Sequence, residues 1–403
     1  MNSGPFRLVV TGGGTGGHTY PALTAVRTLQ ARLARESRGL EVLWIGTADG
    51  LEARVAPAAG IAFTAVATGK IRRSRNPLKM ASPANVRDMA RVPLGVMQAR
   101  RAIDSFRPDV VLATGGYVAV PAGLAARMCH RPLVLHEQTV RLGLANRKLA
   151  SAAARVCVSS ESTLELLSES ARAVAVVTGN PVRPEVLSGQ AARAVRALGL
   201  GGFDRQLPTV YVTGGAQGAQ QINLLIGESL PWLLRQANVI HQCGPDNEAG
   251  LRARAAGLPA GLAARYHLTG FVSGELPDVL ALADVVVSRS GAGTLAELTA
   301  LGKPAVFVPL ASSAGNEQVH NAHHLEEAGA AVALTGEVTA VRLQAAVGPL
   351  LADAPLRSGM AERARAYGRP DAADRLVDEI LSAASGQPVT AGTGLRGESP
   401  LSR

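Results

Sequence analysis

Leu8-Val-Val-Thr-Gly-Gly-Gly-Thr-Gly-Gly17 decides the fold of this chain, because a short apolar run enters a glycine-rich turn that opens a predicted helix. A second stretch, Val210-Tyr-Val-Thr-Gly-Gly-Ala-Gln-Gly218, repeats the same order of strand, Thr-Gly-Gly and helix entry. Such loops let backbone N–H groups at a helix N-terminus approach a phosphate or a sugar. The repetition predicts one strand–loop–helix design that is used once in each half of the chain.

Other short runs rich in Val, Leu and Ile surround both loops and alternate with Ala-rich helical stretches. They cover 41–46, 109–114 and 132–136 in the first half, and 238–242, 284–288 and 304–308 in the second. Strands without polar alternation are buried on both faces, as in a parallel sheet covered by helices. The chain is therefore predicted to be an α/β protein with two Rossmann-like domains.

The pattern of strands restarts after a boundary near 181–208, and 403 residues are enough for two domains with separate cores. We expect an N-terminal domain over 1–182 and a C-terminal domain over 183–365. A helix within 366–384 is expected to pack back on the N-terminal domain. The remaining segment, 385–403, is rich in Gly, Ser, Thr and Pro and is predicted to be disordered.

The formal charge of +10 is unevenly distributed along the sequence. Residues 1–182 carry 23 Lys and Arg against 11 Asp and Glu, while 183–403 carry 18 against 20. This asymmetry predicts an anionic partner for the first half. Nucleic acid is the weaker choice, because only 3% of the residues are aromatic and no recognised nucleic-acid-binding motif occurs.

An anionic membrane leaflet is the preferred partner, and Lys70–Met80 is the predicted contact. This stretch combines the cations Arg72, Arg73, Arg75 and Lys79 with the apolar side chains of Ile71, Leu78 and Met80. The reserve candidate is 87–101, and a solvated basic loop is the simpler alternative. No apolar run reaches the ~18 residues of a membrane span, so we expect a soluble or peripheral protein. Its odd number of cysteines, three, fits reduced thiols.

The first glycine loop also matches the dinucleotide fingerprint, as Gly12-x-Gly14-x-x-Gly17, so a nicotinamide dehydrogenase is a competing hypothesis. The next strand, however, ends in Gly46-Thr47-Ala48-Asp49 without an acidic residue at its tip to hold a ribose. His18 follows the loop, at the carboxyl edge of the predicted sheet. It is a candidate general base, although a hydrogen bond at the helix start would be a simpler role.

The second half carries a predicted nucleotide site. The loop 214–218 opens a helix and can hold a pyrophosphate, and Arg289-Ser-Gly-Ala-Gly-Thr-Leu-Ala-Glu297 repeats that device. Glu297 could accept hydrogen bonds from both ribose hydroxyls, or could be only a favourable charge near a helix start. No Asp-x-Asp pair occurs and His320-Asn-Ala-His-His324 has no carboxylate or cysteine nearby in sequence, so neither a metal nor a cofactor is expected.

Six motifs occur together in one order: Gly-Gly-Thr-Gly-Gly-His (13–18), Thr-Gly-Gly-Tyr (114–117), His-Glu-Gln (136–138), Gly-Asn-Pro-Val-Arg (179–183), Gly-Gly-x-Gln-Gly-Ala (214–219) and Arg-Ser-Gly-Ala (289–292). Over about 1–380 the chain closely resembles the N-acetylglucosaminyltransferases that convert lipid I to lipid II in peptidoglycan synthesis. The resemblance implies the two-domain GT-B fold and a peripheral position on the cytoplasmic face of the cell membrane. It implies UDP-N-acetylglucosamine and undecaprenyl-linked lipid I as substrates, and other cell-wall synthesis proteins as possible partners.

The resemblance also implies roles for individual residues. It puts Tyr117 and His136 on the acceptor side. His18 stays the candidate base on the grounds given above, with Glu137 in reserve because a carboxylate can also serve. Donor contacts are implied for Thr15, Gly16, Gly17, Thr139, Asn146, Arg183, Ala216, Gln217, Gly218, Phe271, Val272, Ala292, Gly293, Thr294, Leu295, Ala296, Glu297 and Gln318. The family usually has Ser at the position of Ala216 and Asn at that of Thr139.

Two further hypotheses share part of this nucleotide chemistry. A UDP-sugar 2-epimerase would have the same two-domain architecture but would need neither a lipid acceptor nor a basic face. A non-catalytic sensor of nucleotide sugars would keep the site of the second domain but would not need His18.

Overall fold

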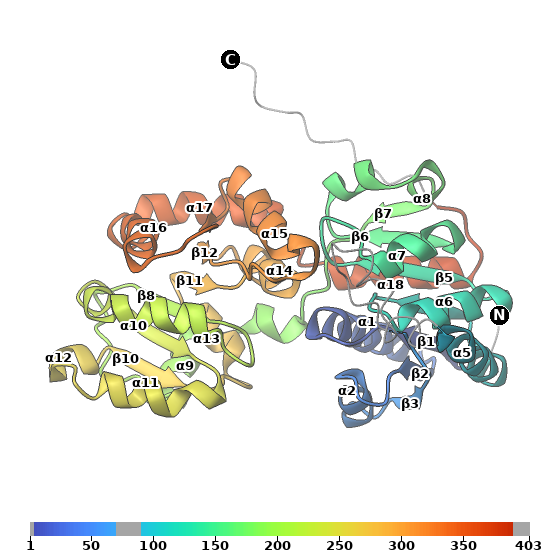
Figure 1. The fold of residues 1–403 in the computed structure, drawn as a ribbon, viewed down its shortest axis with the longest axis horizontal. Helices are drawn as coiled ribbons and strands as arrows, with labels where there is room; N and C mark the ends of the chain where they lie inside the picture. Colours follow the sequence, from blue (N-terminus) through green and yellow to red (C-terminus); the bar gives the residue numbers. More distant parts are fainter. Residues whose placement is uncertain (1–3, 70–89, 390–403) are drawn as a thin grey trace, which may run out of the picture. The chain divides into compact units, whose positions relative to one another are not determined.

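In the computed structural model, which describes residues 4–69 and 90–389, the chain divides into two units. Unit 1 holds the residues up to Gly179 together with those from Asp374 onward, and unit 2 is Asn180–Ala373. Each unit has a parallel sheet between layers of helices (Figure 1). The predicted fold class, two Rossmann-like α/β domains, is confirmed.

Unit 1 is built on a seven-stranded sheet in the order β3-β2-β1-β4-β5-β6-β7, with every pairing parallel. Its strands are β1 (Phe6–Thr11), β2 (Leu40–Gly46), β3 (Ala62–Ala65), β4 (Val110–Ala113), β5 (Leu133–Glu137), β6 (Arg155–Val158) and β7 (Ala175–Val177). Its α-helices are α1 (Gly16–Arg35), α2 (Glu52–Ala58), α5 (Val92–Phe106), α6 (Ala119–Met128), α7 (Leu144–Leu149), α8 (Glu169–Arg172) and α18 (Ala372–Ala384). Ala150–Ala152 and Glu161–Leu166 are 3-10 turns.

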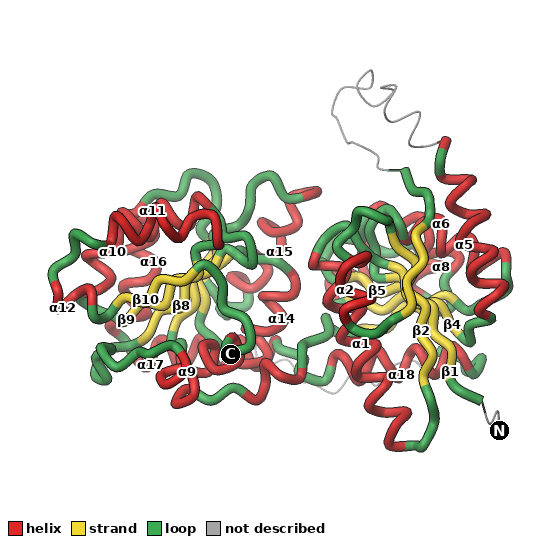
Figure 2. The backbone as a smooth tube through the Cα atoms, turned by 90° about the horizontal axis from the view of Figure 1, so that it is seen from below, coloured by secondary structure: helices red, strands yellow, loops and turns green. Residues whose placement is uncertain are grey.

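The two faces of this sheet have separate cores, because successive residues of a strand point to opposite sides. Val9 of β1 packs with α5 and α6 on one face. Its neighbours Leu8 and Val10 pack with Leu29 of α1 and Val377 of α18 on the other. Figure 2 shows α1 and α18 together along one side of the strands. The apolar strands of the sequence are therefore buried on both faces, as predicted.

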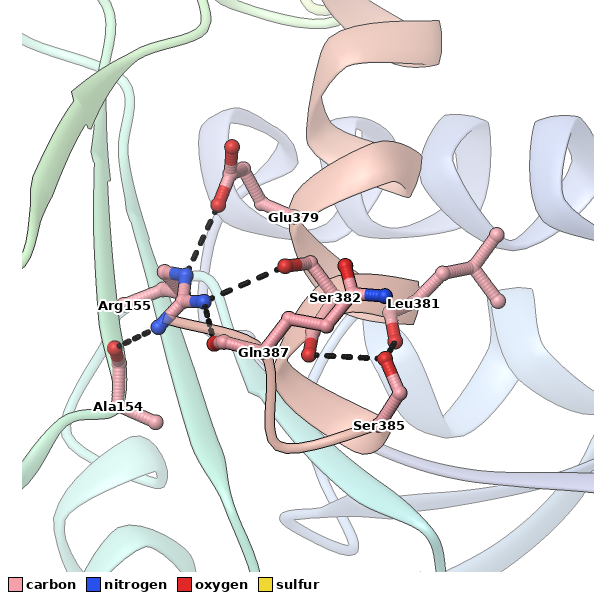
Figure 3. A network of polar contacts seen from close by, with 7 residues as sticks. All are labelled: Ala154, Arg155, Glu379, Leu381, Ser382, Ser385 and Gln387. Carbon is pink, nitrogen blue, oxygen red and sulfur yellow. Dashed lines mark hydrogen bonds and ion pairs between the residues drawn. The ribbon is translucent and has the colours of Figure 1, made fainter. Parts of the chain in front are cut away.

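Helix α18 is the last helix in the sequence but lies in the first unit, and in Figure 1 it is a red ribbon among blue and green elements. Arg155 of β6 anchors it: Nε donates to Glu379 Oε2 at 3.0 Å and Nη2 to Ser382 Oγ at 3.3 Å (Figure 3). Arg155 also donates to the backbone carbonyls of Ala154 and Gln387. All three nitrogens of the guanidinium thus donate hydrogen bonds, to the C-terminal segment and to the residue before β6.

The observed C-terminal helices differ in extent from the expected helix within 366–384, because α17 ends at Tyr367 and α18 starts at Ala372. Of the segment predicted to be disordered, 385–389 is described and includes Gln387, which accepts from Arg155. The rest of that segment lies outside the described residues.

Unit 2 repeats the design with six parallel strands in the order β10-β9-β8-β11-β12-β13. The strands are β8 (Thr209–Thr213), β9 (Asn238–Gln242), β10 (Tyr266–Thr269), β11 (Val285–Ser288), β12 (Ala305–Phe307) and β13 (Val332–Ala333). The α-helices are α9 (Ala191–Ala197), α10 (Gln220–Leu234), α11 (Glu248–Ala255), α12 (Ala260–Ala263), α13 (Leu276–Leu282), α14 (Ala292–Leu301), α15 (Glu317–Glu327), α16 (Ala340–Ala352) and α17 (Ala354–Tyr367). Pro184–Ser188, Pro245–Asn247 and Ala314–Asn316 are 3-10 turns.

The strand order sets the place of a ligand site in each unit. In unit 1 the order reverses between β1 and β4, and in unit 2 between β8 and β11. Ligands of open α/β sheets bind at such switch points, beyond the carboxyl ends of the strands. The glycine loops 12–17 and 214–218 follow β1 and β8, so each lies at the switch point of its own sheet.

Candidate functional site

In unit 1 the loops after β1 and β4 touch directly at the switch point. Thr11 pairs with Ala113 at the ends of the two strands. A Cβ on Gly116 would lie 2.4 Å from the carbonyl oxygen of Gly13, so the two glycine loops can only pack this closely without side chains. The first and second motifs of the sequence are therefore one structural feature.

A buried carboxylate that the sequence analysis missed supports this loop. Glu52 of α2 has no exposed surface, and its oxygens accept from Gly14 N (3.0 Å), Thr47 N (2.9 Å) and Thr47 Oγ1 (2.8 Å). A Cβ on Gly13 would lie 2.2 Å from this carboxyl group. Gly13 therefore makes room for a protein side chain rather than for a ligand.

His18 is the third residue of α1 and is half-buried at the carboxyl edge of the sheet. Two hydrogen bonds clamp it to Thr114: its Nδ1–H donates to the Thr114 carbonyl at 2.9 Å, and Thr114 Oγ1 donates to the His18 carbonyl at 2.9 Å. Gly115, at φ +107°, allows this approach, since a Cβ there would lie 2.9 Å from the imidazole. Among the described residues, Nε2 of His18 has no hydrogen-bond partner, so a lone pair is available on that nitrogen.

His136 is the second residue predicted to lie on the acceptor side, and that role stays a prediction. The ring is completely buried, with Nε2 at 2.9 Å from the Gly179 carbonyl and Nδ1 at 2.9 Å from Gln138 Nε2. Burial lowers the pKa of His136 to about 4, so the ring is neutral near neutral pH. With both nitrogens occupied, His136 lies behind the site and has no free atom to offer a substrate.

Glu137, the reserve base, is also committed within the protein. Its carboxylate accepts from the N–H and hydroxyl of Thr139, from Gly143 N at 2.8 Å and from Asn146 Nδ2 at 3.0 Å. These bonds hold the loop between β5 and α7 and give Thr139 a structural role as well. Asn146 is buried, yet its Oδ1 has no hydrogen-bond partner in the described part of the chain. The contact of Asn146 with the donor sugar stays a prediction, and this unsatisfied oxygen is the acceptor that the residue could offer.

The remaining predicted residues of unit 1 line the open side of the glycine loop. Thr15 and Gly17 are exposed and Gly16 is half-buried, and no side chain caps the N-terminus of α1. The ring of Tyr117 lies over Gly14, where a Cβ would be 3.2 Å from it. Burial raises the pKa of Tyr117, so its phenol stays protonated and can donate a hydrogen bond. Their contacts with a sugar or phosphate stay predictions.

In unit 2 the tip of the loop after β8 is open, since Ala216 and Gln217 are exposed. Gly218 is half-buried, and its N–H closes the turn by donating to Gly215 O at 3.0 Å. Gln242, at the end of β9, braces this loop from below: its Nε2 donates to Gly215 O at 2.9 Å and its Oε1 accepts from Val272 N at 3.0 Å.

The hydrogen bond from Val272 N to Gln242 limits how Val272 could contact uracil. The Val272 N–H is already satisfied within the protein, so its carbonyl is the group that could face a base. Phe271 is exposed.

The loop after β11 leads into α14, whose first residues are the predicted phosphate and ribose contacts. Ala292, Gly293 and Thr294 form its first turn, followed by Leu295, Ala296 and Glu297, and all six are half-buried. No side chain caps this N-terminus, so its N–H groups and helix dipole suit an anion. Glu297 Oε1 accepts from Arg183 Nε at 2.8 Å. The residue predicted to bind the ribose, Glu297, and the residue predicted to bind the phosphates, Arg183, are thus paired with each other.

Gln318 lies at the start of α15 and is tied to the same loop. Its carbonyl accepts from Ser290 Oγ at 2.7 Å, and Asn321 Nδ2 donates to Ser290 O at 3.1 Å. The side-chain oxygen of Gln318 accepts from Leu310 N at 3.0 Å and is therefore engaged within the protein. The contact of its amide NH₂ with a donor sugar stays a prediction. Ser290 and Asn321, absent from the sequence-based candidates, fix the starts of α14 and α15.

The predicted membrane contact Lys70–Met80 lies outside the described residues. The reserve stretch is described from residue 90, where Arg91, Leu94, Met97 and Arg101 are exposed on α5 or at its start. Within 4–69 and 90–389, no helix is both long and apolar enough to cross a membrane. The same residues contain no cluster of three His, Cys, Asp or Glu side chains that could hold a metal ion.

Two family models match the chain, one in each unit. Residues 8–158 match the glycosyltransferase family 28 N-terminal domain, and 209–376 match the family 28 C-terminal domain. A protein of Listeria monocytogenes is 36% identical over 380 residues, covering 93% of this chain and 99% of its own length. One of Geobacter metallireducens is 34% identical over 380 residues, covering 93% and 98%. Both bear the name UDP-N-acetylglucosamine–N-acetylmuramyl-(pentapeptide) pyrophosphoryl-undecaprenol N-acetylglucosamine transferase.

Two solved structures are similar to this chain over most of its length. The crystal structure of MurG from Acinetobacter baumannii matches with a TM-score of 0.71 and 28% identity, covering 94% of this chain and 100% of that one. A putative UDP-N-acetylglucosamine 2-epimerase from Listeria monocytogenes matches with a TM-score of 0.64 at 18% identity, covering 95% and 98%. At that identity the second match shows the fold alone.

Proposed function

The chain belongs to glycosyltransferase family 28, and we propose that it transfers N-acetylglucosamine from UDP-N-acetylglucosamine to the 4-hydroxyl of the muramyl sugar of lipid I, giving lipid II and UDP. The observation that carries this proposal is the match over nearly the whole length of relatives named for that reaction. A glycine loop at the switch point of each sheet supports it. The loop of unit 1 would also suit the dehydrogenase hypothesis, so the match to these relatives is what separates the two.

The reaction is a single inverting displacement. The muramyl oxygen forms a bond to the anomeric carbon of the donor as the bond from that carbon to the diphosphate breaks, which gives a β-1,4 linkage. The electron pair leaves with UDP, and the proton of the attacking hydroxyl goes to Nε2 of His18. His18 suits this step because its Nδ1–H is bonded to Thr114 and its Nε2 is free among the described residues.

The departing diphosphate needs the most stabilisation. Unit 2 offers the uncapped N-terminus of α14 and the open loop 214–218, whose N–H groups can bind phosphate oxygens without a metal. Arg183 adds a charge that is half-exposed and already aligned by Glu297. Binding of UDP would draw this guanidinium toward the phosphates and free the carboxylate for the ribose.

The test of this function is UDP release from UDP-N-acetylglucosamine by the purified full chain, with and without a water-soluble lipid I analogue. A transferase releases UDP in proportion to a new disaccharide product and only slowly without acceptor. Epimerised UDP-sugar without acceptor would instead establish the epimerase. Tight donor binding with no turnover under either condition would leave only the sensor.

Replacing Glu297 with Ala should raise the KM for the donor far more than it changes kcat. Ribose contacts are similar in the ground and transition states, so their loss weakens binding of both equally. Discrimination between uridine and deoxyuridine donors should also loosen. Steady-state kinetics with both donors measure this, with Glu362→Ala, an exposed glutamate of α17, as the control. An unchanged KM would reduce Glu297 to a helix-start charge.

We also propose that Lys70–Met80 binds the anionic membrane in which the lipid acceptor resides. Each cation near an anionic leaflet contributes about 1 kcal/mol, and the three apolar side chains can insert shallowly. Changing Arg72, Arg73, Arg75 and Lys79 to Gln should weaken binding to anionic vesicles and make the residual binding less salt-sensitive, while turnover of a short soluble acceptor stays near normal. Vesicle co-sedimentation across a salt series measures the effect.

The matched control removes the same number of charges from unit 2, as Gln at the exposed Arg196, Arg205, Arg235 and Arg254. Equal loss of binding in both quadruple variants would mean that net charge matters rather than this stretch. Undiminished binding of the first variant would move the membrane contact elsewhere, with the exposed face of α5 as the next candidate.

A further inference from the structure

An uninterrupted chain of side-chain hydrogen bonds runs behind His18, and it includes a residue to which no role has been assigned so far. His18 Nδ1 lies 3.0 Å from Gln138 Oε1, and Gln138 Nε2 lies 2.9 Å from His136 Nδ1. His136 Nε2 lies 2.9 Å from the carbonyl oxygen of Gly179. All four residues belong to unit 1, and Gln138 is 4% exposed and His136 fully buried, so water does not compete for the bonds between these two.

Backbone carbonyls at two points fix the direction of every bond in this chain, because a carbonyl can only accept. Gly179 O requires the proton of neutral His136 to be on Nε2, which leaves Nδ1 as an acceptor. Gln138 Nε2 donates both to that nitrogen and to His136 O at 3.0 Å, so the amide cannot be flipped. Its Oε1 therefore faces His18 as an acceptor.

Burial of His136 supports this directionality. The pKa of His136 is lowered to about 4 because the ring is desolvated, so near neutral pH the ring carries a single proton. A singly protonated ring cannot donate to Gly179 and to Gln138 at once. The amide of Gln138 consequently has one possible orientation in this environment.

We propose that Gln138 is a positioning residue that holds the proton of His18 on Nδ1 and keeps Nε2 as the proton acceptor. This role rests on the function proposed above, in which His18 removes a proton from the attacking hydroxyl. Gln138 shares the Nδ1–H with Thr114 O, so two acceptors converge on one donor. When His18 takes up the proton and becomes charged, both bonds become charge-assisted and stronger. In Ser-His-Asp triads, the Asp behind the catalytic His likewise fixes the tautomer and orientation of the imidazole.

The tautomer can be observed without any substrate. In the full chain labelled with ¹⁵N-histidine, long-range ¹H–¹⁵N correlation at alkaline pH distinguishes Nδ1–H from Nε2–H rings, and His18→Ala identifies the signals of His18. We expect a single Nδ1–H tautomer for His18 and an Nε2–H tautomer for His136. An Nε2–H ring at His18 would overturn the proposal, even if no Gln138 variant can be purified.

Kinetic measurements test whether the positioning of His18 by Gln138 matters for turnover. Gln138→Met keeps the length of the side chain but removes its hydrogen bonds, and should lower kcat by about 10-fold or more with little change in the KM for the donor. With Thr114 O left as the remaining acceptor of the Nδ1–H, the share of the Nε2–H tautomer at His18 should rise, whereas an unchanged tautomer would assign that proton to Thr114 alone and contradict the proposal. Gln98→Met, which removes a 2.7 Å bond to Ala67 N in the same unit, should alter neither the tautomer nor the circular dichroism spectrum.

A double variant separates positioning from structural damage. Because Gln138 acts through the imidazole, Gln138→Met should have almost no further effect on kcat in a His18→Ala background. Independent, multiplying effects in the double variant would contradict the proposal. If wild-type protein had no transferase activity, the proposed function would fail, whereas the tautomer of His18 would still report on the hydrogen-bond chain.

Discussion

Replacing His18 with Ala should lower kcat by ~100-fold or more, the usual scale for loss of a general base, and should leave UDP binding nearly unchanged. The attacking hydroxyl would then have to lose its proton to water. UDP binding should persist because the predicted contacts with uracil and ribose lie in unit 2, whereas His18 lies in unit 1. Single-turnover assays with a soluble lipid I analogue would measure the rate, and titration calorimetry with UDP the affinity.

The control for this experiment is His130→Asn, which removes another imidazole of unit 1 from an exposed site. Asn is chosen because residue 130 has φ +52°, a conformation that Asn tolerates. Turnover close to wild type in His18→Ala would reduce His18 to a structural hydrogen bond at the start of α1. Glu137 would be a poor substitute, because the loop after β5 occupies both of its oxygens.

Replacing Arg155 with Met should destabilise unit 1 by about 3–5 kcal/mol, since breaking a buried ion pair leaves its partner uncompensated. The side chains of Arg155 and Glu379 are only 6% and 16% exposed. The loss should loosen α18 from the core that it shares with α1. Both proteins, with and without Arg155→Met, carry Trp232→Phe, so that Trp44 is the remaining tryptophan and reports on unit 1 alone. Urea denaturation followed by Trp44 fluorescence then measures the free energy of unfolding of unit 1.

Arg7→Met is the matched control, because Arg7 is also a strand arginine of unit 1 paired with a glutamate. That pair, with Glu41, is 39% and 47% exposed, so its loss should cost at most about 1 kcal/mol. Equal losses of unfolding free energy in the two variants would show that the burial of the Arg155–Glu379 pair adds nothing to its effect on stability. If the unfolding transition shifted only when followed by Trp232 fluorescence in the Trp44→Phe background, the destabilisation would lie in unit 2, against the prediction.

The fold could be predicted because its determinants are local in sequence. Apolar strands and glycine-rich helix entries depend on neighbouring residues, and the strand order then brings the loops to the switch points. His18 could be placed in the same way, because it directly follows such a loop. These features needed no knowledge of distant contacts.

The parts of the site that could not be predicted depend on distant partners. Glu52 braces Gly14 across 38 positions of sequence, and Gln138 reaches His18 across 120. Nor could the complete burial of His136 be predicted, because an apolar strand gives no sign of which of its faces meets a ligand. One usable signal was present: Gly46 and Gly50 closely precede Glu52 in the sequence, and both make room for its side chain.

The position of α18 in the sequence also has a consequence for synthesis on the ribosome. Unit 1 needs Leu376, Val377 and Ile380 to close the core against α1 and Trp44, yet these residues are translated only after the whole of unit 2. At ~5–20 residues per second, the roughly 200 intervening residues take on the order of 10–40 s. During that interval the apolar face of α1 lacks its cover. We therefore expect the nascent chain to expose this apolar face, a surface of the kind that chaperones bind, until α18 has been translated.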